Sequence, residues 1–166
     1  ASPVFGAIAN GDKETGVSIM RMTEEVDRGP ILGQANCIIR PGLATQGQAF
    51  TDYENRESLT RRLGILGGKL IVETLKKLEN GQINEVNQPL KSPTFYTHRL
   101  TKDFGRIDWK KSPVEIERFI RAVTPWPGAW TEYREEGRRK KEEGKQIKIL
   151  KAHLEIQQST INNQQL

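Results

Sequence analysis

The sequence predicts an α/β fold in two parts. Strand-like alternation over residues 16–22 and 31–39 precedes a helical spacing over residues 55–78. Residues 82–98 keep no sustained period and contain two prolines, which is typical of a linker. A capped helix and two further strand-like stretches come after them. Strands followed by a long helix indicate an α/β layer. The expected bounds of the first domain, the linker and the second domain are 1–90, 91–111 and 112–166.

A short helix is expected at the start of the first part. Ser2 would cap it, Pro3 would take the first helical position, and Gly11 would end it in the left-handed conformation. The two strand-like stretches then flank a turn at residues 27–30, where the Gly-Pro pair favours a bend. We therefore expect a helix followed by two strands that are close in sequence.

The long helix of the first part is predicted from the spacing of its leucines, and Gly81 closes the run. These leucines are Leu59, Leu63, Leu66, Leu70, Leu75 and Leu78. Three internal glycines, Gly64, Gly67 and Gly68, each cost about 1 kcal/mol relative to alanine. We interpret this cost as the sign of a helix backbone that lies close against a sheet.

The second part is predicted to begin with a helix at Ser112, where Ser112 and Glu115 form a capping box. Two prolines and a glycine then make a rigid corner into a strand, and residues 146–156 return as a second strand beyond a charged loop. Trp126, which lies between the two prolines, is interpreted as a core anchor. A helix and a single hairpin bury little, so we expect this part to be incomplete.

Composition excludes some classes of protein. Hydrophobic residues make up 35% of the chain and charged residues 28%, which allows a modest core. No run approaches the roughly 18 apolar residues of a membrane-spanning helix. Cys37 is the only cysteine, so an internal disulfide is excluded and a reducing compartment is favoured. The first 90 residues carry 10 basic and 11 acidic side chains, the rest 16 and 10. The basic second half indicates a polyanionic partner or a solvated surface.

Several familiar sites are missing from the sequence. It has no Walker loop, no Gly-x-Gly-x-x-Gly and no cluster of cysteines and histidines that would hold zinc. His98 and His153 are far apart in sequence and are interpreted as packing or surface residues. We therefore predict no metal site.

Asp27 is the residue for which the pattern leaves two interpretations. As turn chemistry, its carboxylate would accept hydrogen bonds from backbone amides while Gly29 relaxes the bend. As a functional group, it would be a carboxylate partly screened from water by Val26 and Pro30, able to orient a histidine or move a proton. The turn pattern alone does not decide between them.

The stretch GDKETGVSIMRMTEEVDRGPIL, residues 11–32, resembles the methionyl-tRNA formyltransferase family. That family carries Gly-Asp-x-Glu-Thr-Gly-Val-x-Ile-Met, then Met, then Asp-x-Gly-(Asp/Pro)-Ile at this spacing. The resemblance continues through SLTRRLGILGGKLIVETL, TFYTHRLTKDFGRIDW and IRAVTPWPGAW, and it covers residues 1 to about 156. It implies the C-terminal part of a Rossmann-like formyltransferase domain, then a linker and an incomplete OB-like β-barrel.

The resemblance implies a catalytic role for Asp27. In the family, the aspartate at this position acts with an asparagine and a histidine on 10-formyltetrahydrofolate. The asparagine and the protonated histidine would stabilise an oxyanion, and Asp27 would orient the histidine and help to move a proton. The chain starts at the family's Ala-Ser-Pro segment, so we expect the other two residues and most of the folate pocket upstream of Ala1. We expect a barrel cut short as well, and no formyltransferase activity from these 166 residues alone.

The resemblance also implies that the second domain binds initiator methionyl-tRNA. A basic hairpin there would neutralise phosphates, and Trp126, Trp130 and Tyr133 are aromatic candidates for stacking on bases. Glutamates interleave with the basic residues, so a solvated loop is the alternative interpretation. The candidate tRNA-binding residues are Arg134, Arg138, Arg139, Lys140, Lys141, Lys145 and Lys148.

Two other functions stay open. One is a different 10-formyltetrahydrofolate-dependent transferase that acts on an amino sugar nucleotide or a small amine, although the basic second half argues against a small substrate. The other is a non-catalytic RNA-binding module of the OB type. For the leading hypothesis, a methionyl-tRNA formyltransferase, we expect a monomer without membrane contact in a bacterial cytoplasm or an organelle matrix.

Overall fold

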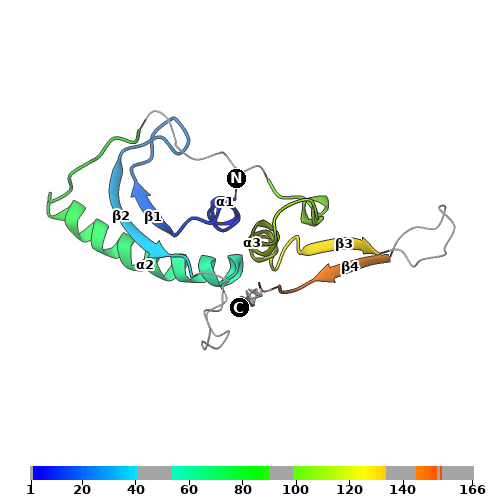
Figure 1. The fold of residues 1–166 in the computed structure, drawn as a ribbon. Coiled ribbons are helices and arrows are strands. Elements are labelled where there is room, and N and C mark those ends of the chain that lie inside the picture. Colours follow the sequence, from blue (N-terminus) through cyan, green and yellow to red (C-terminus); the bar gives the residue numbers. More distant parts are fainter. Residues whose placement is uncertain (1, 41–53, 90–98, 134–144, 153, 155–166) are drawn as a thin grey trace, which may run out of the picture.

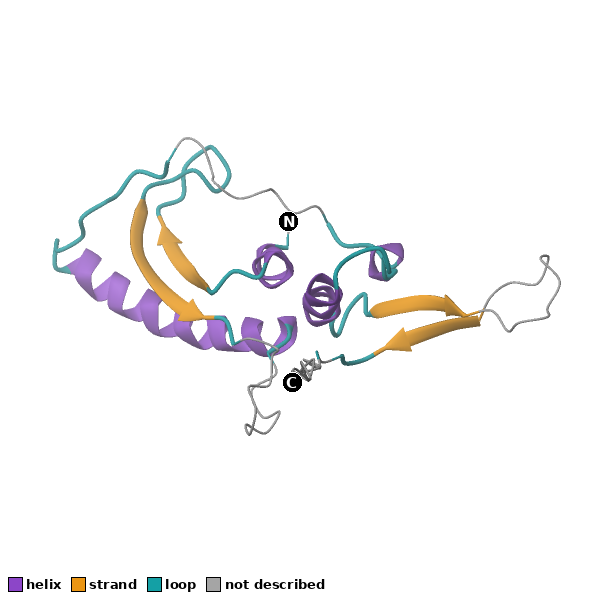
Figure 2. Ribbon diagram, viewed as in Figure 1, coloured by secondary structure: helices purple, strands orange, loops and turns teal. Residues whose placement is uncertain are grey.

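The computed structural model describes residues 2–40, 54–89, 99–133, 145–152 and 154 (Figures 1 and 2). In chain order the elements are α1 (Pro3–Asn10), β1 (Glu14–Met20), β2 (Ile31–Ile38), α2 (Arg56–Glu79), the 3₁₀ helix η2 (Asp103–Gly105), α3 (Pro113–Val123), β3 (Ala129–Tyr133) and β4 (Lys145–Ile149). The α/β prediction is confirmed. Both sheets in this part of the chain have two antiparallel strands.

Helix α1 forms where the sequence predicts it. Pro3 occupies the first turn, and Gly11 ends the helix with φ 76°, a left-handed value that favours glycine. Ser2 precedes the helix without a capping hydrogen bond from its side chain, so that detail of the prediction is wrong. The helix buries one face around Phe5 and Ile8.

Strands β1 and β2 form an antiparallel hairpin in which Gly16 pairs with Asn36. The pairing continues past β1, since the Arg21 amide donates to the Pro30 carbonyl at 2.9 Å. The chain between Arg21 and Pro30 is therefore a loop whose two ends are held together. This loop contains the predicted turn at Asp27.

Helix α2 packs along β1 and β2 (Figure 1). Asn55 and Ser58 cap its first turn reciprocally, and Leu59 and Leu63 are buried. A Cβ at Gly67 would lie 3.3 Å from Val17 Cγ1, which confirms the predicted close approach to the sheet at that position.

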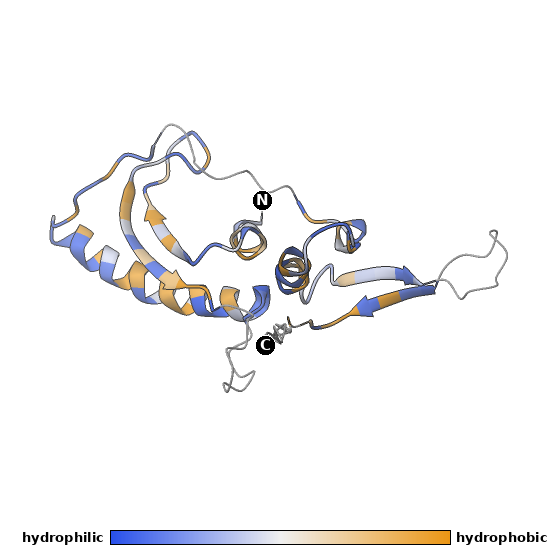
Figure 3. Ribbon diagram, viewed as in Figure 1, coloured by the Kyte–Doolittle hydropathy of each residue, from blue (hydrophilic) through white to orange (hydrophobic). Residues whose placement is uncertain are grey.

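The predicted close approach to the sheet is wrong for the other two glycines. A Cβ at Gly64 or Gly68 would meet nothing within 4 Å, so neither glycine is required by a neighbour. Leu75 is 55% exposed, although Thr74 beside it is buried. A Cβ at Gly33 would lie 2.8 Å from Thr74 Oγ1, so β2 reaches this part of α2 and Leu75 lies on another face of the helix. Figure 3 shows hydrophobic residues along much of the helix.

Residues 82–89 return along β2 after α2 ends (Figure 1). Ile31 and Val86 form an isolated antiparallel bridge with hydrogen bonds of 2.8 and 3.0 Å. The stretch predicted as a linker from residue 82 therefore pairs with a strand edge at Val86.

Helix α3 begins with the predicted capping box of Ser112 and Glu115. Strands β3 and β4 then pair antiparallel. The strand expected over residues 146–156 ends at Ile149. Trp126 is 46% exposed, so the prediction of a core anchor is wrong. The buried positions around that corner are taken by Val123 and Ala129 instead.

The two parts share one hydrophobic core. Helices α1 and α3 lie against each other, and Phe104 links them with its ring centroid 5.2 Å from that of Phe5 and 6.0 Å from that of Phe119. The buried members of the cluster are Phe5, Ala7, Ile8, Ile39, Leu59, Leu63, Leu100, Ile107, Ile120, Ala122, Val123 and Ala129.

Buried charges cross the same junction. Arg121 of α3 donates from Nε to Glu117 Oε1 at 2.6 Å and from Nη1 to the Glu54 carbonyl at 3.1 Å. The Glu54 carboxylate accepts the Arg40 amide at 2.8 Å and pairs with Arg62. Because each of these buried charges has partners, the cost of removing them from water is offset.

Candidate active site

Asp27 lies at the tip of the loop between β1 and β2. Its φ is 58°, and it is the only non-glycine residue with a positive φ in the part of the chain that the structure describes. Such a left-handed residue costs about 1–2 kcal/mol, and aspartate tolerates it better than most. The backbone at Asp27 is therefore held in place by its surroundings.

The Asp27 carboxylate faces water. The residue is exposed, and no described residue donates a hydrogen bond to its carboxylate. The two surroundings predicted for it, a set of backbone amides and a screen of apolar side chains, are therefore both wrong. Backbone amides do not hold the carboxylate, and Val26, expected to screen it, is 85% exposed. The group is left available for contact with a ligand.

Gly29 explains the Asp-x-Gly pattern. The residue is buried, and a Cβ there would lie 1.7 Å from the Arg21 carbonyl oxygen, which no rearrangement of a side chain relieves. The following Pro30 leads directly into β2. Only glycine permits this return of the loop onto its own starting strand.

A residue that the sequence did not single out also holds the loop. Gln88 Nε2 donates to the Asp27 carbonyl at 3.0 Å and to the Gly29 carbonyl at 2.7 Å. Nearby, Arg21 Nε donates to Glu85 Oε1 at 3.0 Å, and this contact raises the pKa of the Arg21 guanidinium. Gln88 lies about 60 residues from the turn in sequence, so no local pattern connects them.

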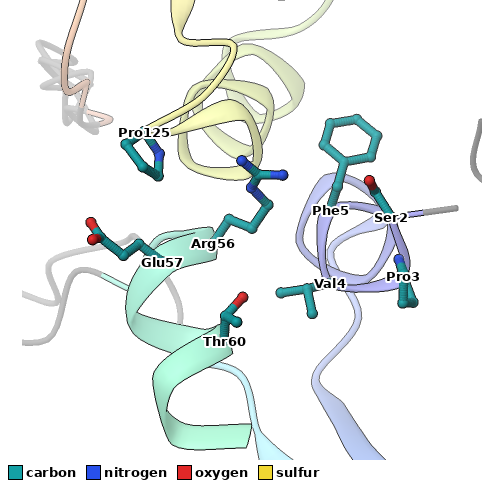
Figure 4. A pocket seen from close by; sticks show the side chains of 8 residues that line it. All are labelled: Ser2, Pro3, Val4, Phe5, Arg56, Glu57, Thr60 and Pro125. Atoms are coloured by element: carbon teal, nitrogen blue, oxygen red, sulfur yellow. The ribbon is translucent and has the colours of Figure 1, made fainter. Parts of the chain in front are cut away.

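A pocket of about 360 Å³ opens between the first turns of α1 and α2 and the corner at Pro125 (Figure 4). Arg56 extends from α2 toward that corner and donates to the Trp126 carbonyl. Val4 and Thr60 lie on the other side of the pocket. Because Arg56 already has a carbonyl acceptor, its contact fixes the corner in position.

The predicted basic hairpin is described only in part. Lys145 pairs with Tyr133 and Lys148 with Trp130. Three positions separate the two lysines, so they lie on opposite faces of the hairpin. The candidates Arg134, Arg138, Arg139, Lys140 and Lys141, and likewise His98 and His153, lie outside the described residues.

Two of the aromatic residues in this region already have partners. The Arg106 guanidinium lies 5.8 Å from the centroid of the Trp130 ring, as in a cation–π contact. The Trp109 indole donates to Thr131 Oγ1 at 2.9 Å. Tyr133, at the end of β3, and Trp126 are each about half exposed, so these two rings are open to a partner such as a base.

The described residues show neither a candidate metal site nor a helix that could span a membrane. They contain no group of three or more His, Cys, Asp or Glu side chains arranged to hold a metal ion. Among their helices, none combines the length and the apolar character that crossing a membrane requires.

Two family models match the chain. "Formyl transferase" matches residues 1–62, and "Formyl transferase, C-terminal domain" matches residues 99–163. The chain therefore belongs to the formyl transferase family. Within that family it is similar to proteins named methionyl-tRNA formyltransferase. The one from Roseiflexus sp. (strain RS-1) is 43% identical over 133 residues, which are 80% of this chain and 37% of that protein. The chain spans about two fifths of the length of the curated relatives it matches.

Solved structures of formyltransferases have a similar fold. A 4-N formyltransferase from Francisella tularensis superposes with a TM-score of 0.62 at 18% identity, covering 93% of this chain and 56% of that one. HypX from Aquifex aeolicus in complex with tetrahydrofolic acid gives 0.59 at 19% identity, covering 80% and 21%. At such identities the likeness shows the fold alone.

Proposed function

We propose that this chain is the middle of an enzyme that transfers a formyl group from 10-formyltetrahydrofolate to the amino group of initiator methionyl-tRNA. The observation that carries the proposal is the Asp27 turn: a carboxylate that accepts no hydrogen bond from the described residues, held at the tip of a loop that Gly29 and Gln88 constrain. The identity to methionyl-tRNA formyltransferases supports this substrate.

In the proposed reaction, the amino nitrogen of the methionyl group attacks the formyl carbon. A C–N bond forms, the bond from that carbon to N10 of the folate breaks, and a proton moves from the amine to N10. Asp27 would keep a histidine protonated and oriented and would help that proton to leave. An asparagine and this histidine, which the family resemblance implies, would stabilise the oxyanion.

The folate co-substrate is supported by a structural relative that was solved with tetrahydrofolic acid. We propose the 10-formyl derivative as donor, with most of its pocket in a segment outside this sequence. A single carboxylate does not build an oxyanion hole, so we propose that the 166 residues alone do not formylate. Formylation of methionyl-tRNA by the isolated chain would contradict this.

The tRNA is proposed to contact the second part, an OB-like barrel of which β3 and β4 would be two strands. Lys145 and Lys148 lie on opposite faces of the hairpin. An RNA backbone that binds one face can therefore place its phosphates against only one of these lysines. The test uses Lys145→Gln and Lys148→Gln in the complete monomeric enzyme. A plot of the logarithm of tRNA affinity against the logarithm of salt concentration should become less steep by about one in one of these variants and stay unchanged in the other.

A first experiment is to sequence the DNA upstream of the Ala1 codon. An in-frame Asn-x-His before a Leu-Leu-Pro segment would support the enzyme, and a start codon or unrelated sequence would favour a non-catalytic RNA-binding module. The protein from the complete gene should then be assayed with methionyl-tRNA and with an amino sugar nucleotide. Formylation of the sugar alone would replace this proposal with the second formyltransferase class. For such a reaction we propose a bacterial cytoplasm or an organelle matrix as the location.

A further inference from the structure

We propose that Gln88 is a positioning residue for Asp27: its side-chain amide fixes the Asp27–Arg28 and Gly29–Pro30 peptide groups, and with them the backbone from which the Asp27 carboxylate projects. This inference rests on the proposed function, since it concerns the residue to which that function assigns a role in moving the proton. Nothing in the family match assigns a role to Gln88.

The contacts of Gln88 define its orientation. Its Nε2 lies 3.0 Å from the Asp27 carbonyl oxygen and 2.7 Å from the Gly29 carbonyl oxygen. A backbone carbonyl only accepts hydrogen bonds, and an amide NH₂ has two hydrogens to donate. One hydrogen is therefore available for each carbonyl. Met20 Sδ, at 3.6 Å from the same nitrogen, adds a weak third contact.

The segment that carries Gln88 is itself anchored. Two residues earlier, Val86 exchanges both backbone hydrogen bonds with Ile31, the first residue of β2. One residue before Val86, Glu85 pairs with Arg21 at the end of β1. Both ends of the Asp27 loop are thus attached to the segment that presents Gln88, so the amide is fixed relative to the loop.

The Asp27 side chain depends on this arrangement because its carboxylate accepts no hydrogen bond from the described residues. The backbone conformation, which sets the direction of the Cα–Cβ bond, is therefore what places the group. With φ at 58°, the Asp27 carbonyl is directed to Gln88 while the side chain faces solvent. If the carbonyls of Asp27 and Gly29 are released, the left-handed backbone loses the contacts that hold it, and the carboxylate samples other directions.

The test compares three single variants in the protein expressed from the complete gene. Gln88→Ala removes both donors, Gln88→Lys keeps a donor group of similar reach, and Gln82→Ala removes a glutamine from an exposed position in the same segment. We expect Gln88→Ala to lower kcat about tenfold with each KM changed less than twofold. Gln88→Lys should recover at least half of that loss, and Gln82→Ala should match the wild type.

A second measurement separates failure of this inference from failure of the proposed function. Backbone amide exchange needs no catalysis and can be followed in the 166-residue chain. The Arg21 and Ile31 amides, which donate to the Pro30 and Val86 carbonyls at the two ends of the loop, should exchange at least fivefold faster in Gln88→Ala and at an unchanged rate in Gln82→Ala. If Asp27→Asn abolishes formylation but Gln88→Ala keeps full kcat, the inference is wrong and the function stands. If Asp27→Asn leaves formylation intact, the proposed function of Asp27 fails and the inference fails with it. If Gln88→Ala does not fold, Gln88→Lys provides the test. A kcat equal to that of the wild type supports the role of Gln88 as a hydrogen-bond donor, and a tenfold lower kcat overturns it.

Discussion

The Asp27 loop and the junction around Arg121 use carboxylates in opposite ways. At the junction, Glu54 and Glu117 are buried, and each has a cation or an amide as partner. Arg121, which pairs with Glu117, also donates to the Glu54 carbonyl and so links α3 to the start of α2. At the loop, the backbone of Asp27 is fixed while its carboxylate has no partner in the part of the chain that the structure describes. A charge that is fully paired contributes to structure, and a charge held open by its backbone is available for chemistry.

The largest expected effect is a loss of activity without a loss of stability when the Asp27 carboxylate is removed. Asp27→Asn in the complete enzyme should lower kcat about 10³-fold, since positioned acid–base groups contribute roughly 10²–10⁴. The midpoint of urea unfolding should not move, because the carboxylate has no partner among the described residues. A loss of stability equal to that of a junction variant would remove the distinction between the regions.

The next effect tests the junction. Arg121→Ala should destabilise the chain by about 3–5 kcal/mol, because it leaves Glu117 buried without its partner. Urea unfolding followed by circular dichroism measures this. Arg106→Ala is the matched control, since its pair with Glu132 is exposed and should contribute at most about 1 kcal/mol. Equal losses in both variants would show that burial of the pair does not matter.

A backbone change should affect the loop more locally. Gly29→Ala introduces a Cβ 1.7 Å from the Arg21 carbonyl, so the loop must open, at a cost of about 1–3 kcal/mol. Gly68→Ala in α2 is the control, because its Cβ has open space and alanine favours a helix. Thermal unfolding should show a lower Tm for the first variant and an equal or higher Tm for the second.

The smallest effect concerns an exposed carboxylate that has a structural role. The hydrogen bonds of Glu115 to Ser112 in the capping box lower the pKa of Glu115 below 4.5, its ordinary value. A lowered folded-state pKa contributes stability above pH 4.5 that is lost as the pH falls through the folded value. Between pH 6 and 3, the Tm of wild type should therefore fall slightly more than that of Glu115→Gln. Parallel curves for the two proteins would contradict this.

Local patterns predicted the local features. The capping box at Ser112, the left-handed stop at Gly11 and the close approach at Gly67 each depend on neighbours in sequence or on one residue type. The Asp-x-Gly-Pro turn also belongs to this group, because a glycine before a proline favours a bend.

Features that depend on distant residues were missed. Gln88 reaches the turn across about 60 residues, and no spacing rule anticipates the contact. The burial of Thr74 depends on the approach of Gly33 in β2, and the exposure of Trp126 on which residues fill the corner. In each case, the sequence pattern specifies the element but not what covers it.

The packing of α1 against α3 has a consequence for synthesis. Helix α1 ends at Asn10 and α3 begins at Pro113, so roughly a hundred residues must be translated between them. At about 5–20 residues per second, α1 leaves the ribosome roughly 5–20 s before the helix that covers it. During that interval its apolar face has no partner from α3, so the timing of the later helix determines when the earlier one is buried.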